Sequence, residues 1–125
     1  MTWVAIALGG AIGSMARHAA NVAIGRVIGH PVPTATAIVN VLGCAVIGAL
    51  AGAIASGRLH MSLPIRTFVF VGILGGFTTF STFGLDTLTP AHEGRPLAAA
   101  ANVAVQAGFG LAAVLAGYAL ALATR

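Results

Sequence analysis

Residues 67–88 read TFVFVGILGGFTTFSTFGLDTL, and this stretch decides both the class of fold and the place of the chemistry. It carries a single charged side chain, Asp86. A helix that crosses about 30 Å of hydrocarbon needs about 20 mostly apolar residues, so the stretch predicts a membrane-spanning helix. Its middle is unusual, because two adjacent glycines, Gly75 and Gly76, precede four hydroxyl side chains within residues 78–82.

The rest of the chain repeats this apolar pattern. Further stretches of membrane-spanning length occupy residues 3–24, 33–55 and 97–123, and the last connection is predicted at residues 90–96, which begin and end with proline. The 125 residues are 58% hydrophobic and 6% charged, with a mean hydropathy of +1.01. A soluble domain carries about 25% charged residues. The sequence therefore predicts an all-α integral membrane protein, a single domain of four transmembrane helices over residues 1–125.

The charged residues exclude several classes of function. The only acids are Asp86 and Glu93, and Glu93 falls in a connection, so no carboxylate pair is expected for catalysis or for a metal. The four histidines fall near predicted helix ends or in connections, without the spacing of metal ligands. The six arginines are scattered, whereas a nucleic-acid surface needs a basic stripe with interleaved aromatics. We therefore expect neither an enzyme nor a nucleic-acid-binding protein.

Glycines recur at a four-residue spacing on three of the predicted helices. The pairs are Gly9 with Gly13, Gly48 with Gly52, and Gly72 with Gly76. Such faces let helix backbones approach closely in lipid, where no hydrophobic effect drives helices together. The sequence therefore predicts close helix packing along these faces.

The polar run of the third predicted helix indicates a binding site. Hydroxyl groups cost free energy in hydrocarbon unless they face protein, water or an ion. The two glycines permit a break in the middle of the membrane, where freed carbonyls bind cations and new helix N-termini favour anions. Thr79, Ser81 and Thr82 are therefore candidate lining residues. The alternative is that the hydroxyls bond to carbonyls of their own helix.

Two phenylalanines and one arginine are further candidates. Phe80 and Phe83 share a helix face, and the electropositive edge of an aromatic ring suits an anion, although packing is the alternative role. Arg17 lies inside the first predicted helix, where a charge is costly in lipid. It is expected to face a wet vestibule or a polar partner.

Side-chain hydroxyl and amide groups also occur in the second and fourth predicted helices. Thr36 and Asn40 lie one turn apart in the second, as do Asn102 and Gln106 in the fourth. Buried amides need partners, and hydrogen bonding between helices is the alternative to a role in binding. Amide donors, hydroxyls and ring edges with almost no acid favour a small anion as the ligand.

The arginines are shared almost evenly between the two sides of the membrane. With four spans, one side holds Arg58, Arg66 and Arg125, and the other holds Arg26 and Arg95, with Arg17 deeper on that half. The Lys/Arg bias of short loops sets orientation, so this near tie predicts that the chain inserts both ways. Opposed copies can pair about a two-fold axis, as an antiparallel, dual-topology homodimer.

Three motifs in order resemble the Fluc (CrcB) fluoride channel family. They are Gly9-Gly10-Ala11-Ile12-Gly13 followed by Arg17, Thr36 with Val39-Asn40, and Gly75-Gly76-Phe77-Thr78-Thr79-Phe80-Ser81-Thr82-Phe83. The likeness covers the whole chain in length and helix count. It implies a passive, fluoride-selective channel in the bacterial inner membrane that exports fluoride and protects the cell from its toxicity.

The resemblance also implies an assembly and a division of roles. The channel would be an antiparallel homodimer with two pores, each lined by both subunits. Phe80 and Phe83 would offer ring edges to dehydrating fluoride, and Asn40 would donate from its amide. Ser81 and Thr82 would line the polar track beside them, with Thr79 and Thr36 in the same pore.

A metal ion and a vestibule are implied in the same way. The backbone carbonyls of Gly75 and Thr78 from both subunits would hold a structural sodium ion at the dimer interface. The chain departs from the family at Ala35, where Gly is frequent, and at Asp86, where the vestibule acid is commonly Glu. It has Gly110 where the fourth helix often has Ser. Asn102 and Gln106 are candidates to carry that fourth-helix track instead.

Two other functions compete with this interpretation. A small dual-topology multidrug exporter has a similar length and helix count, but its proton coupling needs a membrane-embedded carboxylate, typically in the first helix, and residues 1–28 contain none. A non-transporting scaffold subunit of a larger membrane complex would leave the polar run of the third helix unexplained.

Overall fold

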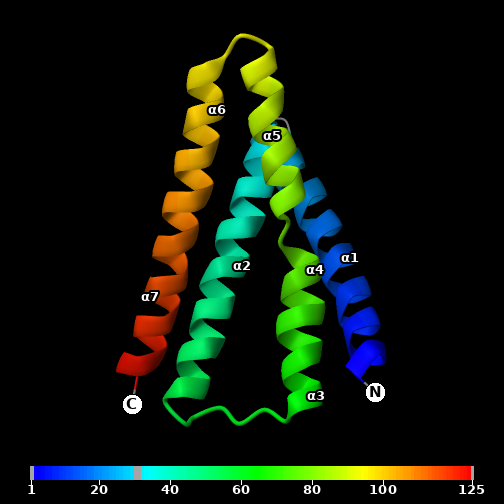
Figure 1. Cartoon of the computed structure of the whole chain (residues 1–125), viewed down its shortest axis with the longest axis vertical. Helices are drawn as coiled ribbons and strands as arrows, with labels where there is room; N and C mark the ends of the chain where they lie inside the picture. Colours follow the sequence, from blue (N-terminus) through cyan, green and yellow to red (C-terminus); the bar gives the residue numbers. More distant parts are fainter. Residues whose placement is uncertain (1, 30–31, 125) are drawn as a thin grey trace.

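The computed structural model describes residues 2–29 and 32–124, and these residues form helices and short connections without any strand. Four long helical segments follow one another along the chain (Figure 1). The first two are α1 (Thr2–Ile28) and α2 (Val32–Ala55). The third comprises α3 (Leu63–Arg66), the π-helix η1 (Thr67–Leu74), α4 (Gly75–Phe77) and α5 (Phe80–His92). The fourth comprises α6 (Pro96–Val103), the π-helix η2 (Ala104–Phe109) and α7 (Gly110–Ala123).

Three of these segments are long and apolar enough to cross a membrane. They are Thr34–Ala55, Leu63–His92 and Pro96–Ala123. The 27-residue α1 is long enough but is not among them, because Arg17, His18 and Arg26 interrupt its apolar run. The predicted all-α class and the span-forming character of the last three segments are thus confirmed, whereas a transmembrane α1 remains a prediction.

The helices extend beyond the predicted spans, since the first continues to Ile28 and the third segment begins at Leu63 and continues to His92. Pro90 was expected to open the connection after the third segment, but it lies inside α5, buried in the last turn of that helix. The helix continues to His92, and the turn that follows uses Gly94 with a φ of +73°. Proline is tolerated there because little helix remains after it, and the positive φ of Gly94 supplies the stop.

Glycines bring the segments together in two pairs. A Cβ on Gly9 or Gly13 of α1 would lie 2.5 Å from Phe68 O or 2.1 Å from Ile73 O of η1. A Cβ on Gly48 of α2 would lie 2.2 Å from Val114 O of α7. No side chain fits in such a gap, so the backbones touch directly. Close packing along the glycine faces is confirmed.

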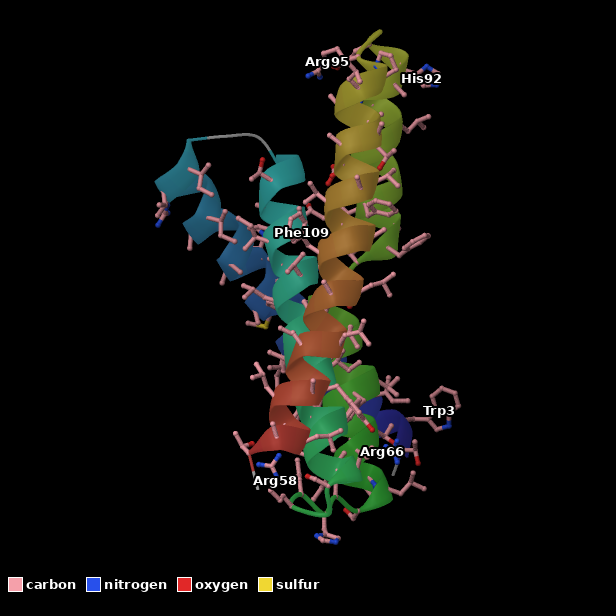
Figure 2. All side chains as sticks on the ribbon, turned by 90° about the vertical axis from the view of Figure 1, so that its left-hand side faces the viewer. Trp3, Arg58, Arg66, His92, Arg95 and Phe109 are labelled. Atoms are coloured by element: carbon pink, nitrogen blue, oxygen red, sulfur yellow. The ribbon has the colours of Figure 1, made fainter. Side chains whose placement is uncertain are left out.

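One pair consists of α1 and the first half of the third segment, and the other consists of α2 and α7. The two ends of the molecule differ (Figure 1). The start of α1, the α2–α3 connection and the end of α7 lie at one end, and the α5–α6 hairpin projects at the other. Figure 2 places Trp3, Arg58 and Arg66 at the first end and His92 and Arg95 at the second. Polar and aromatic side chains at both ends suit a protein whose middle lies in hydrocarbon.

The chain alone buries little apolar surface. Its buried hydrophobic residues include Val39 and Leu74, whereas large side chains such as Leu8, Leu111 and Leu115 are more than half exposed. A continuous apolar exterior of this kind must be covered by lipid or by another protein surface. The exposed apolar side chains therefore fit a protein that lies in a membrane.

Candidate ion site at the break in the third helical segment

The third segment is interrupted at Thr78 and Thr79. These residues have extended backbone, with φ/ψ of −86°/160° and −151°/118°, between the end of α4 and the start of α5. Thr79 is the N-cap of α5, since its hydroxyl oxygen accepts a hydrogen bond of 3.3 Å from the Thr82 N–H. A capping threonine therefore starts the second half of the segment.

The two adjacent glycines do not open the helix, contrary to the sequence prediction. Gly75 and Gly76 are helical within α4, and the interruption follows at Thr78. A Cβ on Gly76 would lie 2.7 Å from Gly10 O of α1. Gly76 is thus used for close helix packing, and the break needs no glycine because its φ values are open to any residue.

The interruption deprives the four carbonyl groups of residues 75–78 of their usual helical donors. In a continuous α-helix the Thr79 N–H would donate to Gly75 O, and the Thr82 N–H would donate to Thr78 O. Here the Thr79 N–H donates to Asn40 Oδ1 at 2.9 Å, and the Thr82 N–H donates to the Thr79 hydroxyl. The carbonyls of Gly75 and Thr78, which the family resemblance implies as ligands, are therefore among the groups free of helical donors at the break.

Asn40 of α2 joins the break to the neighbouring segments. Its Oδ1 accepts the Thr79 N–H, and its Nδ2 donates to Thr79 O at 3.1 Å and to Gln106 Oε1 at 2.7 Å. The side-chain amide thus replaces the helical partners of Thr79. Both N–H groups of Asn40 are occupied in this arrangement.

The fourth segment continues this network. Gln106 is buried in η2, and its Nε2 donates to Asn102 Oδ1 at 2.9 Å. The Asn102 Nδ2 donates to Thr87 Oγ1 at 2.8 Å. The structure thus brings the predicted amides of the second and fourth helices together. Sequence reasoning missed Thr87, whose signal was a hydroxyl one turn after Phe83 on the same helix.

Three of the four hydroxyls within residues 78–82, those of the candidate lining residues Thr79, Ser81 and Thr82, gather at the start of α5. The Thr79 hydroxyl donates to Thr82 Oγ1 at 3.1 Å and lies 3.3 Å from Ser81 Oγ. The Thr78 hydroxyl instead donates to Leu74 O at 2.9 Å, which is the alternative that the sequence left open. The cluster offers polar hydrogens without a positive charge.

The two phenylalanines stand beside an open cavity. Phe80 and Phe83 have ring centroids 5.3 Å apart and planes tilted by 47°, and Phe80 is 84% exposed. The cavity has a volume of about 510 Å³, and its walls include both rings with Asn40, Thr79 and Gln106. Two aromatic rings, two side-chain amides and a threonine therefore line one space, and such groups can contact a small anion without a positive charge.

The residues predicted for a vestibule lie apart from this cavity. Asp86 is 8% exposed and accepts a hydrogen bond from Thr36, which is 1% exposed. The second carboxylate oxygen of Asp86 is buried and has no hydrogen-bond partner among the described residues. Arg17 is half-buried on α1, and within residues 2–29 and 32–124 it forms no ion pair. The structure thus pairs Asp86 with Thr36 and not with Arg17.

The described part of the chain contains no cluster of His, Cys, Asp and Glu side chains that would hold a metal ion. Any cation at the break would be held by backbone carbonyls. Na⁺ is compatible with oxygen ligands of this kind because it is a hard cation. The electrostatics of the site come from dipoles, since the residues around the break are uncharged.

Comparison with known proteins assigns the chain to a family. The family described as "CrcB-like protein, Camphor Resistance (CrcB)" matches residues 4–118. A protein of Rhodospirillum rubrum named "Fluoride-specific ion channel FluC" is 43% identical over 119 residues, covering 94% of this chain and 92% of the relative. A Rhizobium etli protein of the same name is 42% identical over 115 residues, 92% of this chain and 91% of the relative. A family match and relatives that span nearly the full length lead to one conclusion: the chain belongs to the CrcB family of multi-pass membrane proteins.

Proposed function

We propose that the chain is a passive, fluoride-selective ion channel that exports fluoride from bacterial cells. The relatives of similar length are named as fluoride-specific ion channels, and none of those described above is named as an enzyme. The single observation that carries the proposal is the cavity at the break, whose walls combine Asn40, Gln106, Phe80 and Phe83. Gln106 and the two rings offer polarised hydrogens without a fixed positive charge, and Asn40, whose two N–H groups are bonded to Thr79 and Gln106, holds the site together.

The chemistry of this lining suits fluoride in particular. A small anion loses strong hydration on entering a narrow site, and it needs hydrogen-bond donors in return. Amides, hydroxyls and ring edges supply weak positive potential without the deep binding that a lysine or arginine would cause. An ion must bind well enough to enter and weakly enough to leave. A carboxylate for proton coupling is not part of the lining.

The dimer extends this proposal. One copy leaves the cavity open, with Phe80 exposed at its edge and Gly75 exposed nearby. A Cβ on Gly75 would meet only Phe70 O, at 3.7 Å, so packing within one copy does not require this glycine. We infer that a second, antiparallel copy covers this face and completes two pores. In that assembly α1 also crosses the membrane, in addition to the other three segments, and Arg17 lies in a wet vestibule.

The distribution of charge supports two opposed copies. Arg58 and Arg66 lie at one end of the molecule and Arg95 at the other (Figure 2). Counted with Arg125, which the sequence assigns to the first side, and Arg26, which it assigns to the second, the arginines number three against two and leave little overall bias in either direction. A cysteine added at the C-terminus, in a Cys44→Ala background, measures orientation in intact cells. Labelling of about half the population from each side is expected, and labelling from one side only would rule out the antiparallel dimer.

The proposed sodium site rests on two of the carbonyls that lose their helical donors at the break, and the choice of these two follows the family resemblance. Gly75 and Thr78 of two copies would supply four oxygens about a two-fold axis, a hard-ligand set suited to Na⁺. Such an ion would be structural and would stabilise the dimer by mass action. Dimer melting is expected to rise with Na⁺ and not with an equal concentration of a large organic cation. Equal melting in both salts would contradict the site.

A growth assay tests the function in cells. A bacterial strain that lacks its own fluoride channel is transformed with the gene for this chain or for its Asn40→Asp variant. Growth on millimolar-range fluoride is expected with the wild type only, because export lowers the internal concentration. A multidrug exporter would instead protect against cationic drugs, and a scaffold subunit would protect against neither.

A further inference from the structure

A chain of hydrogen bonds that passes through Asn40 has one direction from donor to acceptor. Five successive donor–acceptor pairs connect the break to the middle of α5, with donor–acceptor distances of 2.7–2.9 Å. In order, they run from Thr79 N–H to Asn40, then to Gln106, Asn102, Thr87 and finally Phe83 O. We call Asn40, Gln106, Asn102 and Thr87 the amide relay. The five hydrogen bonds together start at Thr79 and end at Phe83, both on the third segment, and they pass through the second and fourth segments.

The far end of the relay determines the orientation of each member. The Thr87 hydroxyl donates to Phe83 O at 2.8 Å, so it presents a lone pair to the Asn102 N–H. Asn102 must then turn its oxygen toward the Gln106 N–H. An amide has a donor end and an acceptor end, so each bond fixes the next, and such chains strengthen one another.

The near end of the relay is Asn40, the residue that holds the break. Gln106 presents Oε1 to the Asn40 N–H only while its own N–H is taken by Asn102. A Gln106 amide turned the other way would place N–H against N–H. Asn40 would then have to rotate and release the Thr79 N–H.

We propose that Asn102 and Thr87 are positioning residues for Asn40. They contact neither the break nor the phenylalanine rings through their relay bonds, and they act by fixing the orientation of Gln106. Gln106 and Asn102 each use one side-chain N–H in the hydrogen bonds described, whereas Asn40 uses both. The relay therefore keeps Asn40 bonded to Thr79 at the break. It leaves Gln106, which lines the cavity, with one side-chain N–H that takes no part in these bonds.

A neighbouring threonine separates this role from ordinary helix stabilisation. The Thr89 hydroxyl bonds back to Leu85 O at 3.0 Å, as Thr87 bonds to Phe83 O, but Thr89 is exposed. No hydrogen bond from the fourth segment to Thr89 occurs in the described part of the chain. Thr89→Val is therefore a matched control for Thr87→Val, and Thr87→Ser restores the hydroxyl.

The test follows the side-chain amide signals of Asn40 by ¹⁵N NMR of the protein in detergent, assigned by their loss in Asn40→Asp. Thr87→Val is expected to shift or broaden these signals, although two amides separate the residues. Thr87→Ser and Thr89→Val are expected to leave them in place. Unchanged Asn40 signals in folded Thr87→Val would overturn the proposal. If Thr87→Val does not fold, Asn102→Leu takes its place with the same two outcomes.

Fluoride efflux gives a second measurement. Thr87→Val is expected to slow efflux about five- to tenfold, the range that corresponds to one lost hydrogen bond, and Thr87→Ser is expected to restore it. The variant Thr87→Val/Asn102→Leu is expected to be no slower than Asn102→Leu alone, since both break the same chain. Additive losses would overturn the relay. This measurement rests on the proposed fluoride conduction, whereas the amide signals test the relay even in a protein that conducts nothing.

Discussion

Asn40 makes three hydrogen bonds that connect the break to the second and fourth segments, so its replacement by leucine is an informative perturbation. Leucine has a similar size but lacks all three hydrogen bonds that Asn40 makes with Thr79 and Gln106. The Thr79 N–H and the Gln106 oxygen would be left without these partners. A buried polar group without a partner costs about 1–3 kcal/mol, so the two groups together cost about 2–6 kcal/mol.

A second variant separates stability from conduction. In Asn40→Asp one carboxylate oxygen can still accept the Thr79 N–H, and a Gln106 amide that turns over can donate to the other. The bond to Thr79 O is lost, but one hydrogen bond is kept and another is replaced, so less stability is lost than in Asn40→Leu. Fluoride flux is still expected to be lost, because the negative charge beside the cavity repels an anion.

Thermal unfolding in detergent and fluoride efflux from liposomes together measure the two effects. Asn40→Leu is expected to unfold at a clearly lower temperature and to conduct nothing. Asn40→Asp is expected to unfold at a temperature between those of Asn40→Leu and the wild type, and to conduct nothing. Near wild-type efflux from either folded variant would refute the assignment of Asn40 to the pore, and wild-type stability of Asn40→Leu would refute the hydrogen-bond account.

Two further predictions concern the rings and the glycine contacts. Phe80→Ile and Phe83→Ile keep an apolar side chain but remove the electropositive ring edge. Each is expected to lower fluoride efflux at least tenfold, about 1.4 kcal/mol in barrier height, while folding is retained. Efflux within twofold of wild type would show that the rings only pack. Gly13→Ala places a Cβ 2.1 Å from Ile73 O and is expected to destabilise the protein by about 1–3 kcal/mol or more, whereas Gly10→Ala, with no atom within 4 Å of its Cβ, is the control and should unfold like the wild type.

The sequence was a good guide where one periodicity or one residue type decides the structure. Apolar length predicted the helices, and the glycine spacing predicted the close pairs, because lipid leaves backbone contact as the main attraction between helices. The polar run at residues 78–82 marked the site. Its residue types were sufficient because hydroxyls in an apolar stretch need partners.

The sequence was a poor guide to partners between helices. The break was expected at the glycine pair, but it lies at Thr78 and Thr79, where Asn40 supplies the bonds that the helix gives up. That depends on the register of α2 against the third segment, which one sequence does not contain. Asp86 could be recognised as a lone acid but not as the buried partner of Thr36, for the same reason. To predict the relay through Thr87, one would need to know how the second, third and fourth segments are aligned against one another.

The central claim is that this chain conducts fluoride passively and excludes other anions. The most direct measurement loads liposomes containing the purified protein with equal potassium fluoride and potassium chloride, and adds an ionophore that carries only potassium. Ion-selective electrodes then follow both anions as they leave. Fast fluoride efflux, with chloride no faster than from protein-free liposomes and without need of a proton gradient, is the predicted result. Comparable efflux of chloride, or fluoride efflux that stops when the proton gradient is removed, would contradict the account.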